Sequence, residues 1–595
     1  LTDVTGVQTC ALPIYLAGRA SRAMNNTASQ SVGASMVWET GCTGKGIKVG
    51  VLDSGIDTTY AGTDLPAVFQ KKDYSYYPVL DNDVSNTTSG HGTHVTGTVL
   101  GRGILSQGHT HNDNGRGAFK GMAPGADLVF LKIGQDDKSW AEDLGIIGAI
   151  DAAVNIYQVD LLTMSYGGWG DYHDGSEPVD QKVDWAFHQG VPFFCSAGND
   201  GFTDKHWMGT VPAHSHSDLI EVIVDYPGND TTMLRFNMIW ADGFQRNELT
   251  IRYFDANRQP LDDITILPAT ESLKGTESRY SWYNQSLKTA GAFYLQIINN
   301  SPHLQVVHLY EDWNNLKIGS DHVSFKNSVV AYTIGSPSTA EHAFSVGAYV
   351  IRNTWKSSLG NARWWGLDYT ENIIADFSSR GPTLDERTKP DITAPGHVLI
   401  SLRDQKVYTT PGNSWIDNDG IPGGDANYYQ MRGTSMACPV VAGSAALYLE
   451  KNPGATPQQV YDALRNTTNR SGLKNLPDNT YGEGRLNIYS AMKGYRDPTT
   501  IDGDMNDPNY QVAGVFNSNR NGFGDRNDIK ELKYRSDGKN LYLGVTGEIT
   551  GNNNILIFMD FSGVQGRGNN VLGGGNSGDF VYCAFAYIGN TKMDF

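Results

Sequence analysis

Residues 46–57 read GIKVGVLDSGID and place a carboxylate at the end of a short, mostly apolar run. The run from Ile47 to Leu52 is bounded by turn-forming residues, and this pattern is typical of a buried strand. Asp53 follows the last apolar residue of the run. Because α/β proteins place their sites at the carboxyl ends of parallel strands, Asp53 is a candidate functional residue.

Further apolar runs follow along the chain, and amphipathic stretches separate them. Residues 142–159 carry apolar side chains three to four positions apart, which predicts a helix, and residues 179–188 form a shorter candidate. Alternating strands and helices predict an α/β fold with a doubly wound parallel sheet. The other predicted strands of this sheet are Leu128–Ile133, Leu161–Met164 and Val191–Cys195.

The pattern changes after about residue 217, where strand-like segments such as 249–254, 292–298 and 305–310 follow one another almost without helical periodicity. They predict an all-β insertion that splits the α/β domain. Helical patterns return at 435–451 and 456–467. Beyond residue 496 strand-like runs predict a C-terminal β-sandwich, which we expect to be truncated because a strand at 580–588 runs almost to the chain end. The expected division is 15–218 and 331–496 for the split domain, 219–330 for the insertion and 497–595 for the C-terminal module.

The first fourteen residues, LTDVTGVQTCALPI, resemble a translated sequencing adapter, so residues 1–14 are treated as an artefact and left out of the fold prediction. They contain one of the five cysteines. No two cysteines have metal-ligand spacing, which argues against a zinc cluster or a disulfide framework.

Charge and hydropathy exclude two classes of function. Asp and Glu number 64 against 46 Lys and Arg, the net charge is −18, and no basic run stands out, so we expect no nucleic-acid partner. No stretch approaches the roughly 18 apolar residues of a transmembrane helix, so we expect no membrane span and a soluble protein.

Two further segments carry candidates for nucleophilic catalysis. Residues 90–97 read GHGTHVTG and contain His91, and residues 433–439 read GTSMACP and contain Ser435 at the start of a predicted helix. A serine hydroxyl needs a base to take its proton, histidine suits that role near neutral pH, and a buried carboxylate such as Asp53 fixes the histidine tautomer. The order Asp, His, Ser is one of three known for such triads, and the order alone does not identify an enzyme.

The flanking residues make the resemblance specific. VLDSGID, HGTHVTG and GTSMACPVVAG resemble the three catalytic blocks of the subtilisin-like serine proteases (subtilases, peptidase S8 family), and the resemblance extends over most of residues 44–492. MSYGG at 164–168, SAGNDG at 196–201, and FSSRGPT with KPDITAPG at 377–396 resemble further family blocks. The resemblance implies a subtilisin-like fold and a serine endopeptidase in which Asp53 orients His91, His91 is the general base and acid, and Ser435 is the nucleophile.

The same resemblance assigns the remaining site residues. Asn199 would donate to the oxyanion together with the Ser435 N–H, whereas Asp57 and His94 come later in their blocks and are expected to be structural. A substrate would pair with Ser165, Tyr166 and Gly167, and its side chain before the scissile bond would enter a pocket lined by Ser196, Ala197 and Gly198.

Relatives often bind structural calcium, and several loops here are rich in oxygen ligands. The metal candidates are Asp417, Asp419 and Asp425, with residues 112–114 and 502–507 as further loops, although such turns are commonly only solvated. No organic cofactor is expected. The C-terminal module resembles β-sandwiches of secreted hydrolases, some of which bind carbohydrate. The resemblance implies glycan or surface contact, whereas aromatic residues such as those of this module more often fill a core.

These observations predict a secreted, monomeric endopeptidase of broad specificity acting on polypeptides, its signal peptide and pro-segment being absent from this fragment. Activity should rise with a group that titrates near pH 6 to 7, as His91 becomes neutral. Two alternatives stay open: a processing protease of narrow specificity, and an inactive binding protein with a subtilase fold.

Overall fold

The computed structural model divides the chain into two compact units, Met24–Thr468 with Asn475–Tyr495, and Arg496–Phe595 with Leu1–Ala23 and Asn469–Lys474. The first fourteen residues lie outside the described part. The structure describes residues 28–106, 119–136, 140–225, 233–285, 287, 290–311, 322–352, 354–357, 360–363, 370–408, 416–417, 427–494, 511–515, 528–536, 541–548, 554–560, 580–587 and 592–594.

An eight-stranded sheet forms the centre of the larger unit, in the order β21-β18-β6-β5-β1-β4-β2-β3. All neighbours run parallel except the pair β2 and β3. The four strands predicted from apolar runs lie side by side as β6, β5, β1 and β4, and almost all of their residues are buried because both faces of the sheet are covered. The strands are β1 (Lys48–Asp53), β2 (Gln70–Tyr76), β3 (Val79–Asp81), β4 (Asp127–Lys132), β5 (Leu161–Met164), β6 (Phe193–Ser196), β18 (Phe344–Val350) and β21 (Ile392–His397).

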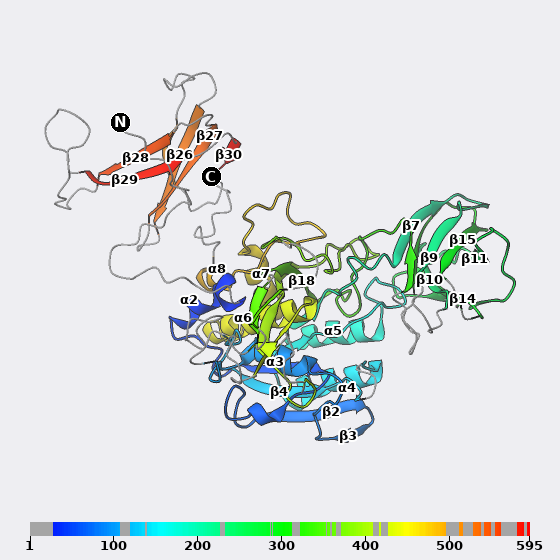
Figure 1. Ribbon diagram of the computed structural model, residues 1–595, viewed down its shortest axis with the longest axis horizontal. Coiled ribbons are helices and arrows are strands. Elements are labelled where there is room, and N and C mark those ends of the chain that lie inside the picture. The colour runs from blue at the N-terminus through cyan, green and yellow to red at the C-terminus, as the bar shows by residue number, and fades with distance from the viewer. Residues whose placement is uncertain are drawn as a thin grey trace. The chain divides into compact units, whose positions relative to one another are not determined.

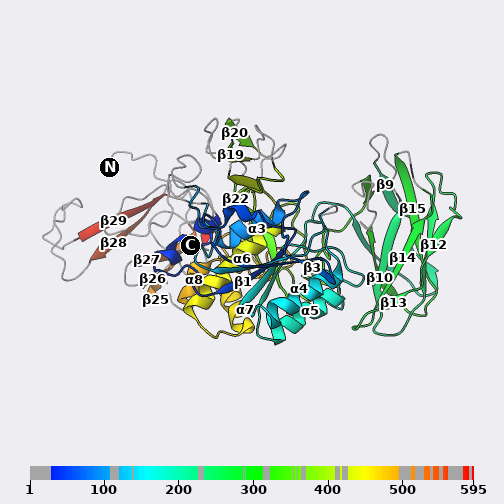
Figure 2. The same ribbon diagram turned by 90° about the horizontal axis from the view of Figure 1, so that it is seen from below.

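Helices cover both faces of this sheet (Figures 1 and 2). Two neighbouring residues of β1 show that helices pack on each face of the sheet. Val51 belongs to one buried cluster with residues of α3 and α6, and Leu52 belongs to a second with residues of α4 and α5. The predicted α/β fold with a doubly wound parallel sheet is therefore confirmed. The helices are α1 (Ala28–Ser31), α2 (Ala34–Trp38), η1 (Thr58–Tyr60), α3 (His91–Leu100), α4 (Asp143–Asn155), α5 (Pro178–His188), α6 (Thr434–Lys451), α7 (Pro457–Asn466) and α8 (Ile488–Lys493).

A β-module, defined here as strands β7 to β17 in residues 206–325, interrupts the α/β region. Its two sheets have the orders β12-β14-β10-β16-β7 and β11-β15-β9-β17, with β13 on β14 and β8 on β15, and their facing sides share one apolar core. The strands are β7 (His206–Val211), β8 (Ser215–His216), β9 (Ile220–Val224), β10 (Arg235–Ala241), β11 (Leu249–Phe254), β12 (Ile264–Ile266), β13 (Thr270–Glu271), β14 (Thr276–Tyr283), β15 (Gly291–Asn299), β16 (Gln305–Glu311) and β17 (Val323–Phe325).

The first strand of the module, β7, begins at His206, before the boundary that the change of composition suggests at residue 219. β7 pairs with β16 from His206 to Val211. Only the two ends of β7 are buried, so no alternation of apolar and polar residues marks it in the sequence. Its place in the module depends on β16, which lies about a hundred residues later in the chain.

Smaller sheets complete the described part. The strands β22 (Leu399–Leu402), β24 (Tyr428–Met431) and β23 (Ile416–Asp417) form one sheet, and β19 (Thr354–Ser357) pairs with β20 (Gly360–Arg363). In the C-terminal unit β25 (Gln511–Val515), β26 (Asp528–Ser536), β27 (Leu541–Glu548) and β30 (Lys592–Asp594) form a four-stranded sheet, and β28 (Asn554–Asp560) pairs with β29 (Phe580–Tyr587).

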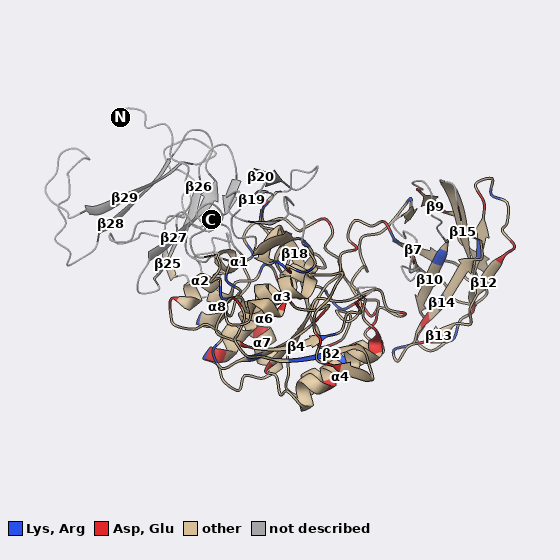
Figure 3. Ribbon diagram, turned by 60° about the horizontal axis from the view of Figure 1, so that its bottom comes forward, with Lys and Arg blue, Asp and Glu red and all other residues tan. Residues whose placement is uncertain are grey.

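Charge is dispersed over the described elements, as Figure 3 shows for both signs. Within the described ranges no helix combines the length and the apolar composition needed to cross a bilayer.

Candidate active site

Three elements of the α/β region carry the predicted catalytic residues. Asp53 is the last residue of β1, His91 is the first residue of α3, and Ser435 is the second residue of α6. Gly92 lets α3 approach β1 closely, because a Cβ atom at this position would lie 2.9 Å from Asp53 Oδ1 and 2.3 Å from the carbonyl oxygen of Gly55. Only a residue without a side chain fits there.

Asp53 and His91 form a hydrogen-bonded pair. His91 Nδ1 lies 2.8 Å from Asp53 Oδ1, and the Ser54 N–H donates to the same oxygen at 2.7 Å. Asp53 is fully buried, whereas the His91 side chain is 24% exposed. Burial disfavours the imidazolium, but attraction and hydrogen bonding by the Asp53 carboxylate outweigh it and raise the pKa of His91 above its ordinary value. With Nδ1 donating to Asp53, Nε2 is the nitrogen able to accept a proton.

Ser435 is coupled to the segment after β5 by two reciprocal hydrogen bonds. Its hydroxyl donates to the Ser165 carbonyl at 3.1 Å, and the Ser165 hydroxyl donates to the Ser435 carbonyl at 2.9 Å. The Ser435 carbonyl can accept this bond because Pro439, four residues later in α6, has no N–H to offer it. To donate to His91, the Ser435 hydroxyl has to leave its bond to Ser165.

Asn199 lies beside the N-terminus of α6. Its Oδ1 accepts the Thr434 N–H at 2.9 Å and the Thr434 hydroxyl at 3.1 Å, so its Nδ2 remains as the donor. A Cβ atom built on Gly433 would lie 3.6 Å from both Asn199 Nδ2 and the Ser435 backbone nitrogen. The Asn199 amide and the Ser435 backbone nitrogen therefore both lie beside Gly433 at the N-terminus of α6, where N–H donors and the helix dipole suit a developing oxyanion.

The segment Ser165–Gly167 continues from the buried strand β5 towards the site. The Tyr166 ring stands edge-on to His91, with 5.9 Å between ring centroids, and burial raises the pKa of the Tyr166 hydroxyl. The next residue, Gly168, donates its N–H to the Ser336 carbonyl at 3.0 Å. Gly167 passes so close to this carbonyl that a Cβ atom would lie 2.7 Å from the oxygen.

The small residues 196–198 lie at the end of β6, and hydrogen bonds and close contacts hold them from several sides. The Ala197 N–H donates to Val346 at 3.0 Å, and the Gly335 N–H donates to the Ala197 carbonyl at 3.3 Å. Ser196 is buried, and its carbonyl accepts the Ser338 hydroxyl at 2.9 Å. Gly198 has a φ of +111°, and a Cβ atom there would lie 2.6 Å from Ser379 Oγ.

Sequence reasoning did not single out several residues that shape this site. Thr434 and Ser379 lie inside blocks that the family resemblance already marks, so inspection of those blocks could have found them. Gly335 and Ser336 come after the β-module in the sequence, and no local sequence pattern connects them to residues 167–168 or 197.

The two residues expected to be structural have structural partners. Asp57 accepts the Thr59 N–H at 3.0 Å and the Gln405 N–H at 3.1 Å. His94 is fully buried, and its Nε2 donates to the carbonyls of Leu399 and Tyr429 at 3.1 and 3.0 Å. Burial lowers the pKa of His94 to about 3, which keeps its ring neutral.

The metal candidates fall outside the part of the chain described in atomic detail. Asp417 is described only as backbone in β23, and Asp419 and Asp425, like residues 112–114 and 502–507, lie outside the described residues. Over the described ranges, no group of three or more His, Cys, Asp or Glu side chains is placed to hold a metal ion.

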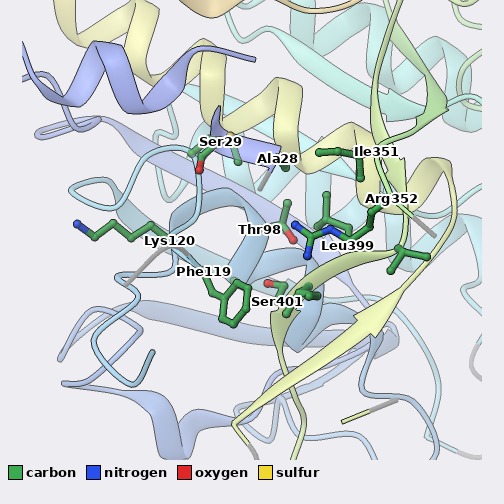
Figure 4. Close-up of a pocket in the computed structure, with 13 residues that line it drawn as sticks. Ala28, Ser29, Thr98, Phe119, Lys120, Ile351, Arg352, Leu399 and Ser401 are labelled. Carbon is green, nitrogen blue, oxygen red and sulfur yellow. The ribbon is translucent and has the colours of Figure 1, made fainter. Parts of the chain in front are cut away.

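A small cavity lies between α1, α3 and β22 and is separate from the predicted catalytic residues. Figure 4 shows its lining, which includes Ser29, Thr98, Arg352 and Ser401. Its volume of about 20 Å³ is room for about one water molecule, far too little for a peptide.

Comparison with known proteins adds an independent finding. A model of the Subtilase family matches residues 44–301 and 318–484, more than half of the chain. The minor extracellular protease Vpr of Bacillus subtilis is 25% identical over 481 residues, covering 78% of this chain and 53% of Vpr. The serine protease AprX of the same organism is 39% identical over 163 residues, covering 27% of this chain and 32% of AprX. The chain thus spans about half or less of the length of these two relatives.

One plant relative and one solved structure extend the comparison. The subtilisin-like protease SBT4.15 of Arabidopsis thaliana is 26% identical over 444 residues, covering 70% of this chain and 53% of that protein. A solved structure titled S41 Psychrophilic Protease is 18% identical with a TM-score of 0.40 and covers 75% of this chain and 92% of that one.

Proposed function

The chain belongs to the Subtilase family, and on that basis we propose that it is a serine endopeptidase that hydrolyses peptide bonds with Asp53, His91 and Ser435. The observation that supports this most directly is the 2.8 Å bond between His91 Nδ1 and the buried Asp53 carboxylate. It leaves Nε2 of a partly exposed, basic imidazole available to take a proton.

In the first step, the Ser435 hydroxyl transfers its proton to His91 Nε2 while Oγ bonds to the substrate carbonyl carbon. The carbonyl π electrons move to the oxygen, which becomes an oxyanion between Asn199 Nδ2 and the Ser435 N–H. Asp53 stays ionised, keeps the ring in the required tautomer and stabilises the imidazolium.

In the second step, the oxyanion collapses and the C–N bond breaks as His91 gives its proton to the leaving amine. The product is an ester between Ser435 and the acyl part of the substrate. Water then attacks this ester with His91 again as base, and collapse of the second tetrahedral intermediate releases the acid and restores the Ser435 hydroxyl.

An extended substrate would pair with the backbone of Ser165, Tyr166 and Gly167. Its side chain before the scissile bond would lie against Ser196, Ala197 and Gly198, whose small size permits a roomy pocket and does not define a preference. We propose broad specificity and degradative activity. We propose that the enzyme is exported and acts as a monomer. A narrowly specific processing protease remains the alternative, and a peptide-library cleavage profile with a tight motif would favour it.

The decisive experiment is labelling with a serine-directed fluorophosphonate together with casein cleavage. Wild-type protein should react, and Ser435→Ala should lose both labelling and cleavage. Ser444→Ala is a matched control, because Ser444 lies on the same helix and its hydroxyl donates within that helix to the Val440 carbonyl at 2.8 Å. Folded wild-type protein that does not react would contradict the proposal and favour the inactive binding protein, as would a Ser435→Ala variant that still cleaves casein.

We also propose structural calcium, without an organic cofactor, and glycan or surface contact by the C-terminal module. Calcium would be held by carboxylate and amide oxygens in loops such as 417–425 and would stabilise the fold without joining the reaction. Dialysis against EDTA should lower the thermal midpoint, and added Ca²⁺ but not Mg²⁺ should restore it. An unchanged midpoint would count against calcium.

A further inference from the structure

The loop at residues 168–176 directly continues the substrate-binding segment. Its first residue, Gly168, pairs with Ser336, and the backbone of Ser165–Gly167 precedes it without a break. Any displacement of this loop would therefore shift the backbone that is proposed to pair with substrate.

Three buried or half-buried side chains of the β-module donate hydrogen bonds to this loop. The Tyr280 hydroxyl on β14 donates to Asp171 Oδ1 at 2.6 Å, and Asn237 Nδ2 on β10 donates to the Asp171 carbonyl at 3.1 Å. The Ser272 hydroxyl, just after β13, donates to Asp174 Oδ2 at 2.6 Å. Two of the three bonds end on carboxylates, which are strong acceptors.

Ring packing joins the same two parts of the protein. The His173 ring stacks on Tyr310 of β16 with 4.1 Å between centroids, and the Trp169 ring stands edge-on to Tyr310 at 5.1 Å. Tyr310 and Ile239 of the β-module share an apolar cluster with Leu384 of the α/β region, and Trp169 packs against it.

The α/β region holds the loop from the other side. His173 Nδ1 donates to the Ile334 carbonyl at 3.1 Å, the Leu384 N–H donates to the His173 carbonyl at 3.0 Å, and Arg387 donates to the Asp174 carbonyl at 2.9 Å. His173 has a φ of +52°, a left-handed conformation that side chains other than glycine adopt at a cost. Contacts from the β-module and from the α/β region together maintain this conformation. Loss of the contacts from the β-module would therefore allow the 168–176 loop to move to a less strained conformation.

We propose that the β-module positions the substrate-binding segment, and that Ser272 and Tyr280 are positioning residues that act through the 168–176 loop. Neither residue touches substrate, and both set the geometry of the backbone that does. The proposal rests on the proposed endopeptidase function and adds a role for the β-module in substrate binding.

The test is steady-state kinetics of Ser272→Ala/Tyr280→Phe with tetrapeptide p-nitroanilides that differ only in the residue before the scissile bond. We expect KM to rise about tenfold while kcat stays within about twofold of wild type. The displaced backbone of Ser165–Gly167 would pair less well with the substrate, and this loss would be the same in the ground state and in the transition state. Tyr253→Phe is the matched control: it removes a buried tyrosine hydroxyl bond, to Ser281 Oγ at 2.9 Å, that lies wholly inside the β-module. Its KM should stay within about twofold of wild type.

Assays are run well below the thermal midpoint of every variant, so that a general loss of stability does not change KM. If the double variant does not fold, Ser272→Ala and Tyr280→Phe are measured singly and should each raise KM by about threefold. An unchanged KM in folded variants, or an equal rise in Tyr253→Phe, would overturn the positioning role. If wild-type protein neither cleaves the peptides nor reacts with the fluorophosphonate, the endopeptidase function itself fails, and this proposal fails with it.

Discussion

At the scale of single residues, the Asn199 side chain has two distinct ends. Its Oδ1 accepts both the N–H and the hydroxyl of Thr434, and this leaves Nδ2 as the donor of the amide, next to Gly433 and Ser435. Asn199→Asp keeps an acceptor for Thr434 and replaces the donor. We expect kcat to fall by at least about 100-fold with little change in KM, because the lost bond stabilises the oxyanion. Steady-state kinetics measure this, and a kcat within tenfold of wild type would remove Asn199 from the oxyanion site.

The pH dependence of activity follows from His91. A general base works only when neutral, and Asp53 raises the pKa of His91 above its ordinary value. The value of kcat/KM should therefore fall as pH decreases, with a midpoint above about 6.5. Asp53→Asn should lower this midpoint and reduce kcat by about 10⁴-fold. A profile that is flat from pH 5 to pH 9 would contradict the role of His91.

At the scale of elements, α7 begins with a complete capping box. Thr456 Oγ1 accepts the Gln459 N–H at 3.3 Å, and Gln459 Oε1 accepts the Thr456 N–H at 2.9 Å. Thr456→Ala should lower the free energy of unfolding by about 1 kcal/mol, because the helix N-terminus loses an acceptor. Urea denaturation measures the change. Thr456→Ser should lose much less, and kcat/KM should be unchanged in both variants because Thr456 belongs to none of the site's contacts.

At the scale of the whole molecule, two buried histidines, His206 and His308, lie side by side where the β-module meets the α/β region. His206 Nδ1 donates to the Val329 carbonyl at 3.0 Å, which leaves His206 Nε2 to accept from His308 Nδ1 at 3.0 Å. In this arrangement both rings are neutral, and burial disfavours the charged form of each. Burial accordingly lowers the pKa of His206 to about 4 and that of His308 well below its ordinary value.

The lowered pKa values of His206 and His308 predict a pH dependence of stability. Between about pH 6.5 and pH 4 the unfolded chain binds protons that the folded rings do not, so these histidines reduce the free energy of unfolding as pH falls. His308→Asn keeps a donor for His206 and removes one titrating group. From pH 6 to pH 5 wild type should lose about 1 kcal/mol more than this variant by urea denaturation. The exposed His216→Asn is the control, and equal losses in wild type and His308→Asn would refute the prediction.

Local patterns in the sequence predicted the elements that carry the site. Apolar runs between turn residues predicted β1, β4, β5 and β6, because a strand that is buried on both faces of a parallel sheet has a nearly continuous apolar sequence. Three-to-four spacing predicted α4 and α5, because a helix that is buried on one face repeats its apolar residues with that period. The motif blocks predicted Asp53, His91 and Ser435 as the catalytic residues, and this assignment stays a prediction, while the structure places Asp53 in hydrogen-bond contact with His91.

Only the tertiary structure decided what surrounds these residues. The strand β7 joins its sheet by pairing with β16. Ser336, which follows the β-module in the sequence, pairs with Gly168. Ser272 and Tyr280 bond to the 168–176 loop, which lies roughly a hundred residues earlier in the sequence. Such contacts join segments whose local sequence carries no periodicity or motif that predicts the pairing. Periodicity predicts which face of an element is buried, whereas the partner that buries it is selected by packing and hydrogen-bond geometry in the folded chain.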